Sequence, residues 1–337
     1  MAKESLAVKY RPKTFDDLTE QEAIKIILEN QISTKTFQHA YLFIGPAGTG
    51  KTTSARIFAD MINNGKGNPI EVDAASNSGV DNIRTIIEDS KKKSLDSEYK
   101  IFIIDECHSL SNGAWQAMLK LLEEPPKYSI FILCTTDPQK IPATILSRVQ
   151  TYQFNKISSD GITRRLEYIL DAEQIENYEQ SAIEYISKIS LGGMRDAITT
   201  VDKCLSLSSD LTLNNVLKSV GDEDYDVYFN LLSMLLEKND ECVDIIDKVF
   251  DSGKDIRNFL SRFIRFVLDV AKYEIFMDLK NTSLPENEEI ENDLNDLISI
   301  GKSSKLLKHL MMLEGQAKYS QSPKETIEIG LLVMCEE

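Results

Sequence analysis

One short string in this chain restricts its fold more than any other feature. Residues 45 to 52 read Gly-Pro-Ala-Gly-Thr-Gly-Lys-Thr, and they directly follow the apolar run Tyr41 to Ile44. A G-x-x-x-x-G-K-[ST] pattern after a buried strand predicts a phosphate-binding loop at a strand-to-helix turn. The residues predicted to surround the phosphates are Gly45, Pro46, Ala47, Gly48, Thr49, Gly50, Lys51, Thr52 and Thr53.

The residue types in this string indicate what it binds. Glycines allow the backbone to curl until its N–H groups point inward at the phosphates. Lys51 can reach the β- and γ-phosphates, and the Thr52 hydroxyl can bind Mg²⁺. We therefore expect the chain to bind a nucleoside triphosphate together with Mg²⁺. A glycine-rich turn that binds nothing is the alternative, and the string alone identifies neither the base nor the use of the energy.

The region from about residue 20 to 155 alternates helical periods with short apolar runs. Strands separated by helices in this way predict a parallel sheet with helices on both faces. Ligands of such sheets bind at the carboxyl ends of the strands, where the phosphate loop lies. The predicted strands are Tyr41–Ile44, Ile70–Asp73, Ile101–Asp105, Ile130–Cys134 and Thr151–Phe154.

The rest of the chain shows only helical periodicity. From 157 to 207 it is broken once, at Gly192-Gly193, and beyond Asp210 it is interrupted by an acidic, Pro-containing stretch, Asn281 to Asp293, that predicts a connector. We expect three domains: an α/β P-loop domain over 1–156, a small helical domain over 157–209 and an all-α domain over 210–337.

A pair of acidic residues ends the third predicted strand, where Ile101 to Ile104 runs into Asp105-Glu106. One carboxylate beside a phosphate loop can hold Mg²⁺, and a second can polarise the attacking water. We assign Asp105 to the metal and Glu106 to the role of general base, with an ordinary surface turn as the alternative. The next strand delivers the hydroxyls of Thr135 and Thr136 to the same edge of the sheet.

Two arginines are candidates for neutralising charge during phosphoryl transfer. Arg148 ends a predicted helix, and Arg195 follows the Gly192-Gly193 break at the start of another. An arginine supplied by the same chain or by a neighbouring one can accelerate such a reaction by about a thousandfold or more. Without further context, an arginine at such a position is more often a surface salt-bridge partner.

The net charge of −16 argues at first against a nucleic-acid partner. Residues 1–170 carry no net charge, however, whereas residues 171–210 carry −5 and residues 211–337 carry −11. A local basic surface on the first half is therefore still possible, and Lys91-Lys92-Lys93 with Lys100 is a candidate for it. A solvated helix end is the alternative.

Cysteine usage and hydropathy give two further expectations. The five cysteines are scattered singly, which predicts reduced thiols and no zinc site. The chain has no run of eighteen apolar residues and no leader-like start, so we expect a cytoplasmic protein without a membrane partner.

With these strings in view, the sequence resembles the AAA+ ATPases of the clamp-loader group, and most closely the gamma/tau subunits of bacterial DNA polymerase III. The resemblance covers residues 8 to 205, and its Glu-Glu-Pro-Pro and Ser-Arg strings distinguish this group from other P-loop ATPases. The matching segments are Lys9–Phe15, His39–Phe43, Asp73–Ser76, Leu119–Pro126, Thr135–Pro142, Ile145–Arg148 and Gly193–Ala197.

The resemblance implies roles for single residues. Tyr10, Arg11 and Pro12 match a segment that lines the adenine side of the pocket, which implies ATP. Thr136 matches the sensor of the γ-phosphate, and Arg195 matches a second sensor from the small helical domain, which corresponds to the family's lid. Arg148 matches an arginine finger that acts in trans on the nucleotide of a neighbouring subunit.

The sequence departs from the family pattern at two places. Most bacterial members carry a four-cysteine zinc module before the Asp-Ala-Ala-Ser string, whereas residues 59–68 bridge that gap here without cysteine, so zinc is not expected. Position 149 is Val where the family usually has Cys. A zinc-free short form fits a reduced bacterial system or a phage, and hence a bacterial or a host cytoplasm.

The resemblance implies an ATP-driven loader subunit. It would assemble with other clamp-loader subunits into an oligomer, expected to be pentameric, through a collar domain at 210–337, and place a ring-shaped sliding clamp on primer–template DNA. We expect backbone contacts to DNA from helix N-termini near Ser76 to Arg84 and near Asn112 to Gln116. The alternatives are a subunit that binds ATP without hydrolysing it, and another AAA+ motor such as a helicase loader or branch-migration ATPase.

Overall fold

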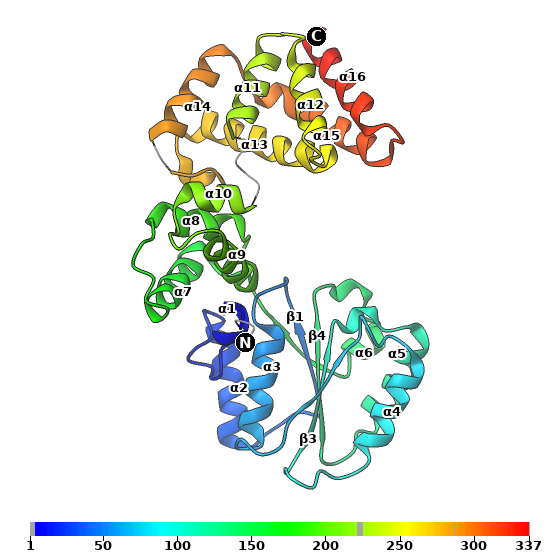
Figure 1. The fold of residues 1–337 in the computed structure, drawn as a ribbon. Helices are drawn as coiled ribbons and strands as arrows, with labels where there is room; N and C mark the ends of the chain where they lie inside the picture. The colour runs from blue at the N-terminus through cyan, green and yellow to red at the C-terminus, as the bar shows by residue number, and fades with distance from the viewer. Residues whose placement is uncertain (1–3, 221–224, 287, 337) are drawn as a thin grey trace. The chain divides into compact units, whose positions relative to one another are not determined.

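The computed structural model describes residues 4–220, 225–286 and 288–336. By compactness the chain divides into two units, the first comprising Met1–Gln174 and Ser190–Asp202 and the second comprising Ile175–Ile189 and Lys203–Glu337 (Figure 1). Each unit is described by itself below. The three-domain division of the sequence stays a prediction.

The first unit is built around a five-stranded parallel sheet with the strand order β2-β3-β4-β1-β5. Each predicted strand is present, and its bounds move by no more than one residue. The continuous apolar runs of the inner strands β1, β3 and β4 made these recognisable, since both faces of the sheet are covered there. The strands are β1 Ala40–Ile44, β2 Ile70–Asp73, β3 Lys100–Asp105, β4 Ser129–Thr135 and β5 Gln150–Gln153.

Helices cover both faces of this sheet, as predicted. The helices α2 (Glu22–Thr34) and α3 (Lys51–Ile62) lie on one face, and α4 (Val80–Ser90), α5 (Asn112–Glu123) and α6 (Ala143–Leu146) lie on the other (Figure 1). Alternate residues of β1 serve the two layers: Tyr41 and Phe43 belong to one apolar cluster, and Leu42 and Ile44 belong to the other. All five residues of β1 are buried.

The strand order decides which loops meet at the carboxyl edge. Strand β4 pairs with β1 on one side and with β3 on the other. The phosphate loop follows β1, and Asp105 ends β3, so the end of β4 lies between them. Thr135 is the last residue of β4, and Thr136 follows it directly. The topology therefore brings the loop, the acidic pair and the two threonines to one place.

The first unit contains three further α-helical elements. They are α1 (Leu6–Lys9), α7 (Ser159–Ala172) and the start of α9 (Met194–Leu207), which the division at Asp202 splits between the units. Ser158 caps α7, because its hydroxyl accepts the backbone N–H of Gly161 at 3.0 Å. The Ser158 backbone N–H donates in turn to Glu20 at 3.1 Å.

The described part of the second unit is entirely helical apart from a bridge between Tyr178 and Leu211. Its core surrounds the longest helix, α13, whose Phe263 and Val267 have no solvent exposure. The helices are α8 Gln180–Ile189, α10 Leu213–Val220, α11 Tyr225–Leu236, α12 Cys242–Asp251, α13 Ile256–Phe276, η3 Leu279–Asn281, α14 Glu288–Ile300, α15 Ser304–Tyr319 and α16 Pro323–Glu336.

The prediction of a connector from Asn281 to Asp293 is wrong for its second half, which is helical, because α14 begins at Glu288. Ile290, Leu294 and Leu297 recur at helical spacing, and all three are buried in the core of the second unit. The sequence predicts a connector there because the polar residues between these three give this amphipathic helix a composition typical of a solvated loop.

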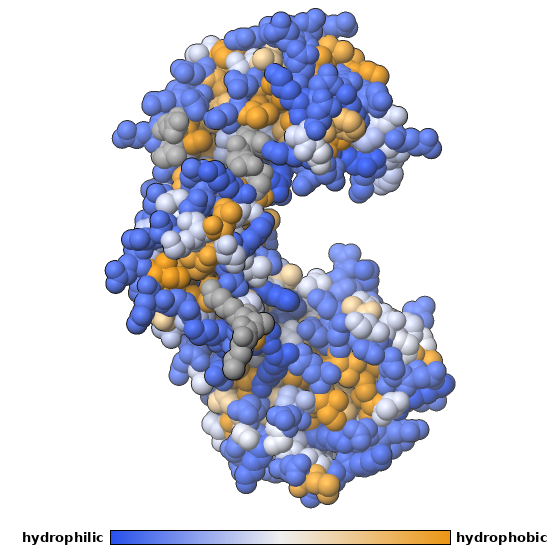
Figure 2. All heavy atoms as spheres, in the orientation of Figure 1, coloured by the Kyte–Doolittle hydropathy of each residue, from blue (hydrophilic) through white to orange (hydrophobic). Residues whose placement is uncertain are grey.

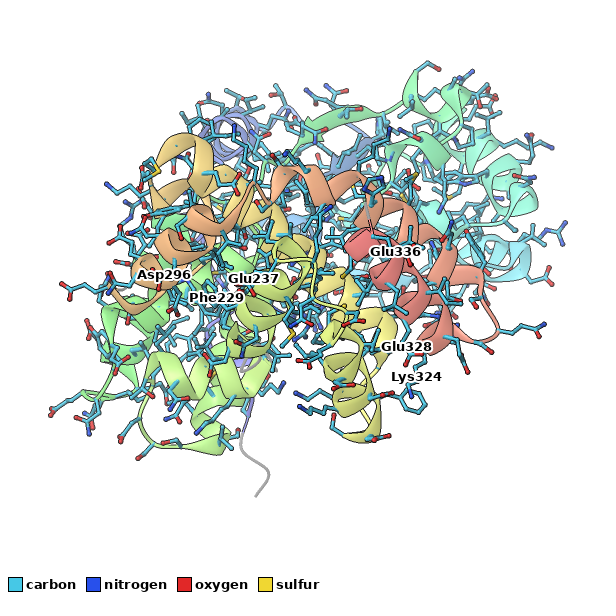
Figure 3. All side chains as sticks on the ribbon, turned by 90° about the horizontal axis from the view of Figure 1, so that it is seen from above. Phe229, Glu237, Asp296, Lys324, Glu328 and Glu336 are labelled. Carbon is cyan, nitrogen blue, oxygen red and sulfur yellow. The ribbon has the colours of Figure 1, made fainter. Side chains whose placement is uncertain are left out.

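The face shown in Figure 2 carries mainly hydrophilic residues, with hydrophobic residues in separate patches. On α16 the ammonium of Lys324 lies 2.5 Å from Asp247 and 3.6 Å from Glu328, which is four residues further along the same helix (Figure 3). Among the described residues, no helix combines the length and the apolar character that crossing a membrane requires.

Candidate functional site

The loop between β1 and α3 depends on glycine at two positions. Gly48 and Gly50 have φ values of +71° and +99°, in the left-handed region that L side chains rarely adopt. A Cβ atom at Gly48 would lie 3.0 Å from Cα of Gly193, and one at Gly50 would lie 2.9 Å from the Leu18 side chain. The loop is therefore closely packed between the start of α9 and the segment that precedes α2.

Lys51 is the first residue of α3, and its ammonium is turned back into the loop. Nζ donates to the backbone carbonyls of Gly45 at 2.8 Å and Pro46 at 2.7 Å. The residue is only 6% exposed, and burial lowers the pKa of its ammonium. Neutral carbonyls compensate a buried charge only in part, so this ammonium favours an anion.

Thr52 and Asp105 meet across the gap between α3 and β3. The Thr52 hydroxyl donates to Oδ2 of Asp105 at 2.7 Å, and the other oxygen of Asp105 accepts the backbone N–H of Glu106 at 2.9 Å. Hydroxyl and carboxylate oxygens are hard ligands of the kind that Mg²⁺ prefers. The structure thus brings together the two residues that the sequence assigned to the metal.

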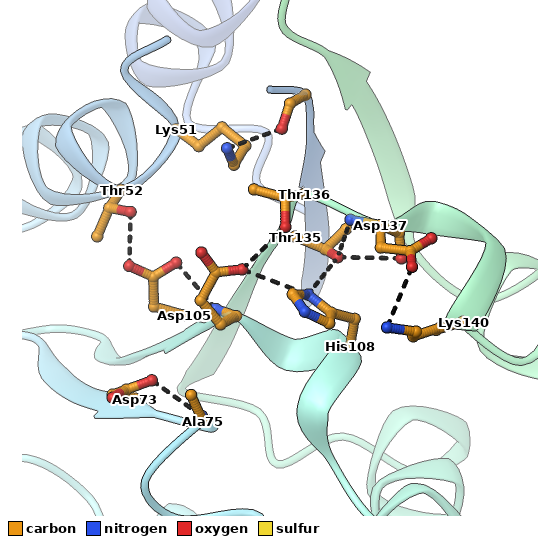
Figure 4. A network of polar contacts seen from close by, with 12 residues as sticks. Lys51, Thr52, Asp73, Ala75, Asp105, His108, Thr135, Thr136, Asp137 and Lys140 are labelled. Carbon is orange, nitrogen blue, oxygen red and sulfur yellow. Dashed lines mark hydrogen bonds and ion pairs between the residues drawn. The ribbon is translucent and has the colours of Figure 1, made fainter. Parts of the chain in front are cut away.

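Glu106 is held by two neighbours beyond the end of the sheet. Its φ of +47° turns the chain sharply after β3. Oε2 accepts the Thr136 hydroxyl at 3.2 Å and lies 3.3 Å from Nδ1 of His108 (Figure 4). The predicted general base and the predicted γ-phosphate sensor are therefore in direct contact.

His108 and Thr135 are members of this network to which the sequence assigned no specific role. His108 lies in the short helix η1 (Cys107–Ser109), and its Nδ1 is also 3.2 Å from the hydroxyl of the fully buried Thr135 (Figure 4). The Thr135 hydroxyl accepts the backbone N–H of Asp137 at 3.0 Å. The sequence signal for this role was a histidine two residues after the acidic pair. The position of its ring could not be predicted, because it depends on the left-handed turn at Glu106.

The start of α9 lies against the phosphate loop. The backbone N–H of Met194 donates to the carbonyl of Gly48 at 3.0 Å. The backbone nitrogen of Arg195 lies 3.4 Å from the position that a Cβ at Gly48 would occupy. The fold thus places Arg195 next to the loop, as its predicted role requires.

The segment expected to line the adenine side follows α1. Tyr10, Arg11 and Pro12 are half-buried, and the chain then continues to Leu18, which packs against the loop at Gly50. The Tyr10 carbonyl accepts from Arg165 of α7 at 3.1 Å. The segment is therefore fixed both to the loop and to a helix of the predicted lid.

Arg148 lies just beyond α6 and is occupied by local partners. Its guanidinium donates to Glu123 at 2.8 Å, to the carbonyl of Thr144 at 2.6 Å and to the hydroxyl of Ser147 at 2.9 Å. These bonds leave the side chain one-third exposed. Within one chain the arginine is a salt-bridge partner, and its predicted action in trans stays a prediction.

Lys100 does not add free charge to the proposed basic surface. Its ammonium lies 2.7 Å from Asp89, and its side chain is only 16% exposed. Lys93 lies 4.9 Å above the Tyr128 ring. The helices α4 and α5 begin at Val80 and Asn112, inside the segments expected to contact DNA, and that role stays a prediction.

The cysteines near the site are protonated thiols. Burial is the main cause that raises the pKa of Cys107 and Cys134. In the described part of the chain, no group of three or more His, Cys, Asp or Glu side chains is arranged to hold a metal ion. The Mg²⁺ site would thus draw on one hydroxyl and one carboxylate, with the remaining ligands coming from phosphate and water, as is usual for this ion.

Two protein-family models match the chain. The model described as DNA polymerase III, delta subunit, matches residues 68–158. The model described as DNA polymerase III clamp loader subunit, ATPase lid domain, matches residues 161–210. The first match covers strands β2 to β5, and the second covers the helices that follow the sheet.

Curated relatives extend the match to the whole chain. DNA polymerase III subunit tau of Bacillus subtilis is 35% identical over 100% of this chain, which spans 64% of that relative. DNA polymerase III subunit gamma of Buchnera aphidicola subsp. Schizaphis graminum is 30% identical, and the alignment covers 98% of this chain and 96% of the relative.

A solved structure with a similar fold is the Thermotoga maritima RuvB Holliday junction branch migration motor. It superposes with a TM-score of 0.53 at 19% identity, covering 68% of this chain and 80% of that one. At this identity the likeness concerns the fold alone. With the lid match and the helices of the second unit, it confirms the predicted AAA+ fold class.

Proposed function

Because the chain belongs to the gamma/tau subunit family of DNA polymerase III, we propose that it is an ATP-hydrolysing subunit of a clamp loader in DNA replication. It would use ATP to place a ring-shaped sliding clamp on primer–template DNA. In this proposal residues 1–156 form the ATPase domain, residues 157–209 form the lid, and residues 210–337 form the collar that joins subunits.

One observation supports this proposal most strongly. Lys51, Thr52, Asp105, Glu106 and Thr136 converge at the carboxyl edge of β1, β3 and β4, although they lie on three separate segments. Two of them are paired at 2.7 Å and two at 3.2 Å. A turn that only resembled a phosphate loop would not need an acidic pair and a hydroxyl aligned beside it.

The residues divide the reaction among them. Lys51 and the loop N–H groups would bind the phosphates, and Thr52 with Asp105 would hold Mg²⁺, which neutralises developing charge on the phosphate oxygens. Glu106 would take a proton from the attacking water. At the same time the water oxygen would bond to the γ-phosphorus, and the bond between the γ-phosphorus and the bridging oxygen of the β-phosphate would break. Thr136 would orient Glu106 and contact the γ-phosphate, and Arg195 would contact it from the lid.

The proposal also includes partners and a location. Arg148 would complete the site of a neighbouring subunit, so the active form would be an oligomer, expected to be pentameric. Its partners would be other loader subunits, the sliding clamp and DNA held through its backbone. We place the protein in a bacterial cytoplasm, or in a host cytoplasm if a phage encodes it, and we expect no zinc.

The experiment that tests this function is a steady-state ATPase assay of the full chain. It is run alone, with partner subunits, and with clamp and primed DNA added together. We expect the rate to rise when clamp and primed DNA are both present, and Glu106→Gln to remove that activity in every condition. Equal rates in all conditions for the unaltered chain would contradict the loader assignment, and absence of any activity would favour a subunit that binds ATP without hydrolysing it.

A further inference from the structure

The segment that precedes the phosphate loop is attached to the end of helix α7 by a side-chain cluster. We propose that Glu173, Arg165 and Tyr10 form a latch that positions residues 10–12 beside the base of the nucleotide and thereby sets the affinity for ATP. The inference rests on the proposed nucleotide site and goes beyond it, because it assigns a positioning role to Glu173 and Arg165.

The centre of the latch is the carboxylate of Glu173, the residue that caps the C-terminus of α7. It accepts the Tyr10 hydroxyl at 2.5 Å and forms an ion pair with Lys9. The Glu173 side chain is only 18% exposed. A carboxylate that accepts two donors in a largely buried position binds them more strongly than a neutral acceptor would.

Arg165, which lies two turns before Glu173 on α7, contacts the backbone of Tyr10. Its guanidinium donates to the Tyr10 carbonyl at 3.1 Å and lies 4.9 Å from the centre of the Tyr168 ring. The Tyr168 ring stands edge-on to the Tyr10 ring, with 6.5 Å between the ring centres. Tyr10 is thus fixed at its hydroxyl, its ring and its carbonyl by residues of one helix.

The latch is close enough to the phosphate loop to position the intervening segment. Leu18 packs at Gly50 of the loop, and between the two lies a turn in which Asp17 accepts the backbone N–H of Thr14 at 3.1 Å. The chain from Tyr10 to Leu18 is therefore tied at both ends and in the middle. Releasing Tyr10 would free Arg11 and Pro12 and leave the loop in place.

Because the latch holds residues 10–12 and leaves the phosphate loop in place, it can be tested by comparing a ligand that has a base with one that has none. A residue that orders the base side should change the affinity for ATP and leave that for inorganic tripolyphosphate unaltered, because tripolyphosphate has no base. A residue that only stabilises the fold should change both affinities together.

The test is a set of equilibrium titrations of the full chain with ATP and with tripolyphosphate, both with Mg²⁺. We expect Glu173→Ala and Tyr10→Phe each to weaken ATP binding by about three- to tenfold, the range for one or two partly exposed hydrogen bonds. Their double variant should be little weaker than Glu173→Ala, because both remove the same contact. Glu173→Gln keeps a neutral acceptor for the Tyr10 hydroxyl and should therefore lose less ATP affinity than Glu173→Ala.

The matched control is Asp171→Ala, which removes an exposed carboxylate from the same turn of α7 and should change neither affinity. Unaltered ATP affinity in Glu173→Ala and Tyr10→Phe, or an equal loss for both ligands, would overturn the latch. Failure of the proposed function is distinguishable, because the unaltered chain would then bind neither ligand.

Discussion

At the scale of single residues, the candidate site is held together by contacts that a nucleotide has to replace or use. The buried ammonium of Lys51 donates to carbonyls of its own loop, and the Glu106 carboxylate is bonded to Thr136 and lies beside His108. The contacts of Glu106 preorganise the base that is to receive a proton. Because His108 contacts Glu106 and lies outside the phosphate loop, its removal should change the rate of hydrolysis without changing how the loop binds phosphate.

We expect His108→Ala to lower kcat by about fivefold, which corresponds to the loss of about 1 kcal/mol from the one polar contact by which His108 positions Glu106. ATP affinity should stay unaltered, because His108 contacts Glu106 and Thr135 and lies outside the loop. Single-turnover hydrolysis combined with an ATP titration separates the two quantities. His108→Asn offers an amide N–H near the position of Nδ1 and should recover part of the rate. A loss of affinity with unaltered kcat would contradict this positioning role.

At the scale of elements, the phosphate loop and the start of α9 form one packed junction. Gly48→Ala should destabilise the fold and weaken ATP binding, because the new methyl would meet Cα of Gly193 at 3.0 Å. Gly65→Ala is the matched control, since its φ of +73° nearly equals the +71° of Gly48 and a Cβ there would meet nothing within 4 Å. Both variants should lose about 1 kcal/mol of unfolding free energy from backbone strain.

Only Gly48→Ala should lose more than that amount and also lose ATP affinity. Thermal unfolding of both variants, together with ATP titrations, checks this expectation. Equal effects of the two substitutions on stability and on binding would mean that the contact between the loop and α9 contributes nothing.

The helices and strands also show how much of the fold could be predicted from the sequence. The five strands were predictable to within one residue. The inner strands β1, β3 and β4 are largely continuous apolar runs, because both faces of the sheet are covered there, whereas the edge strands β2 and β5 include polar residues. The order of the strands was not predictable from those runs, and it is the order that brings Thr136 to Glu106. Helix α14 was missed because acidic residues separate Ile290, Leu294 and Leu297. The bond between Tyr10 and Glu173 joins residues 163 positions apart, which no local pattern reports.

At the scale of the whole molecule, the proposed site needs one charge from outside its own loops, which Arg148 of a neighbouring subunit is predicted to supply. In this chain Arg148 is bonded to Glu123, Thr144 and Ser147, and among the described residues its hydrogen bonds include none to the loop or to the acidic pair. A finger that serves a neighbouring subunit has to be exposed in the isolated chain, and this guanidinium is one-third exposed. We therefore expect assembly to decide whether the site is active.

Mixing two inactive variants tests this dependence. Lys51→Ala removes the phosphate contact but keeps the finger, whereas Arg148→Ala keeps the phosphate contact and lacks the finger. If Arg148 acts in trans, mixed oligomers should regain part of the ATPase activity, because the arginine of one variant completes the site of the other. Mixing Arg148→Ala with the double variant Lys51→Ala/Arg148→Ala is the control, and it should give no recovery. Equal activity of the two mixtures, with co-assembly verified by light scattering, would show that Arg148 is only the salt-bridge partner of Glu123.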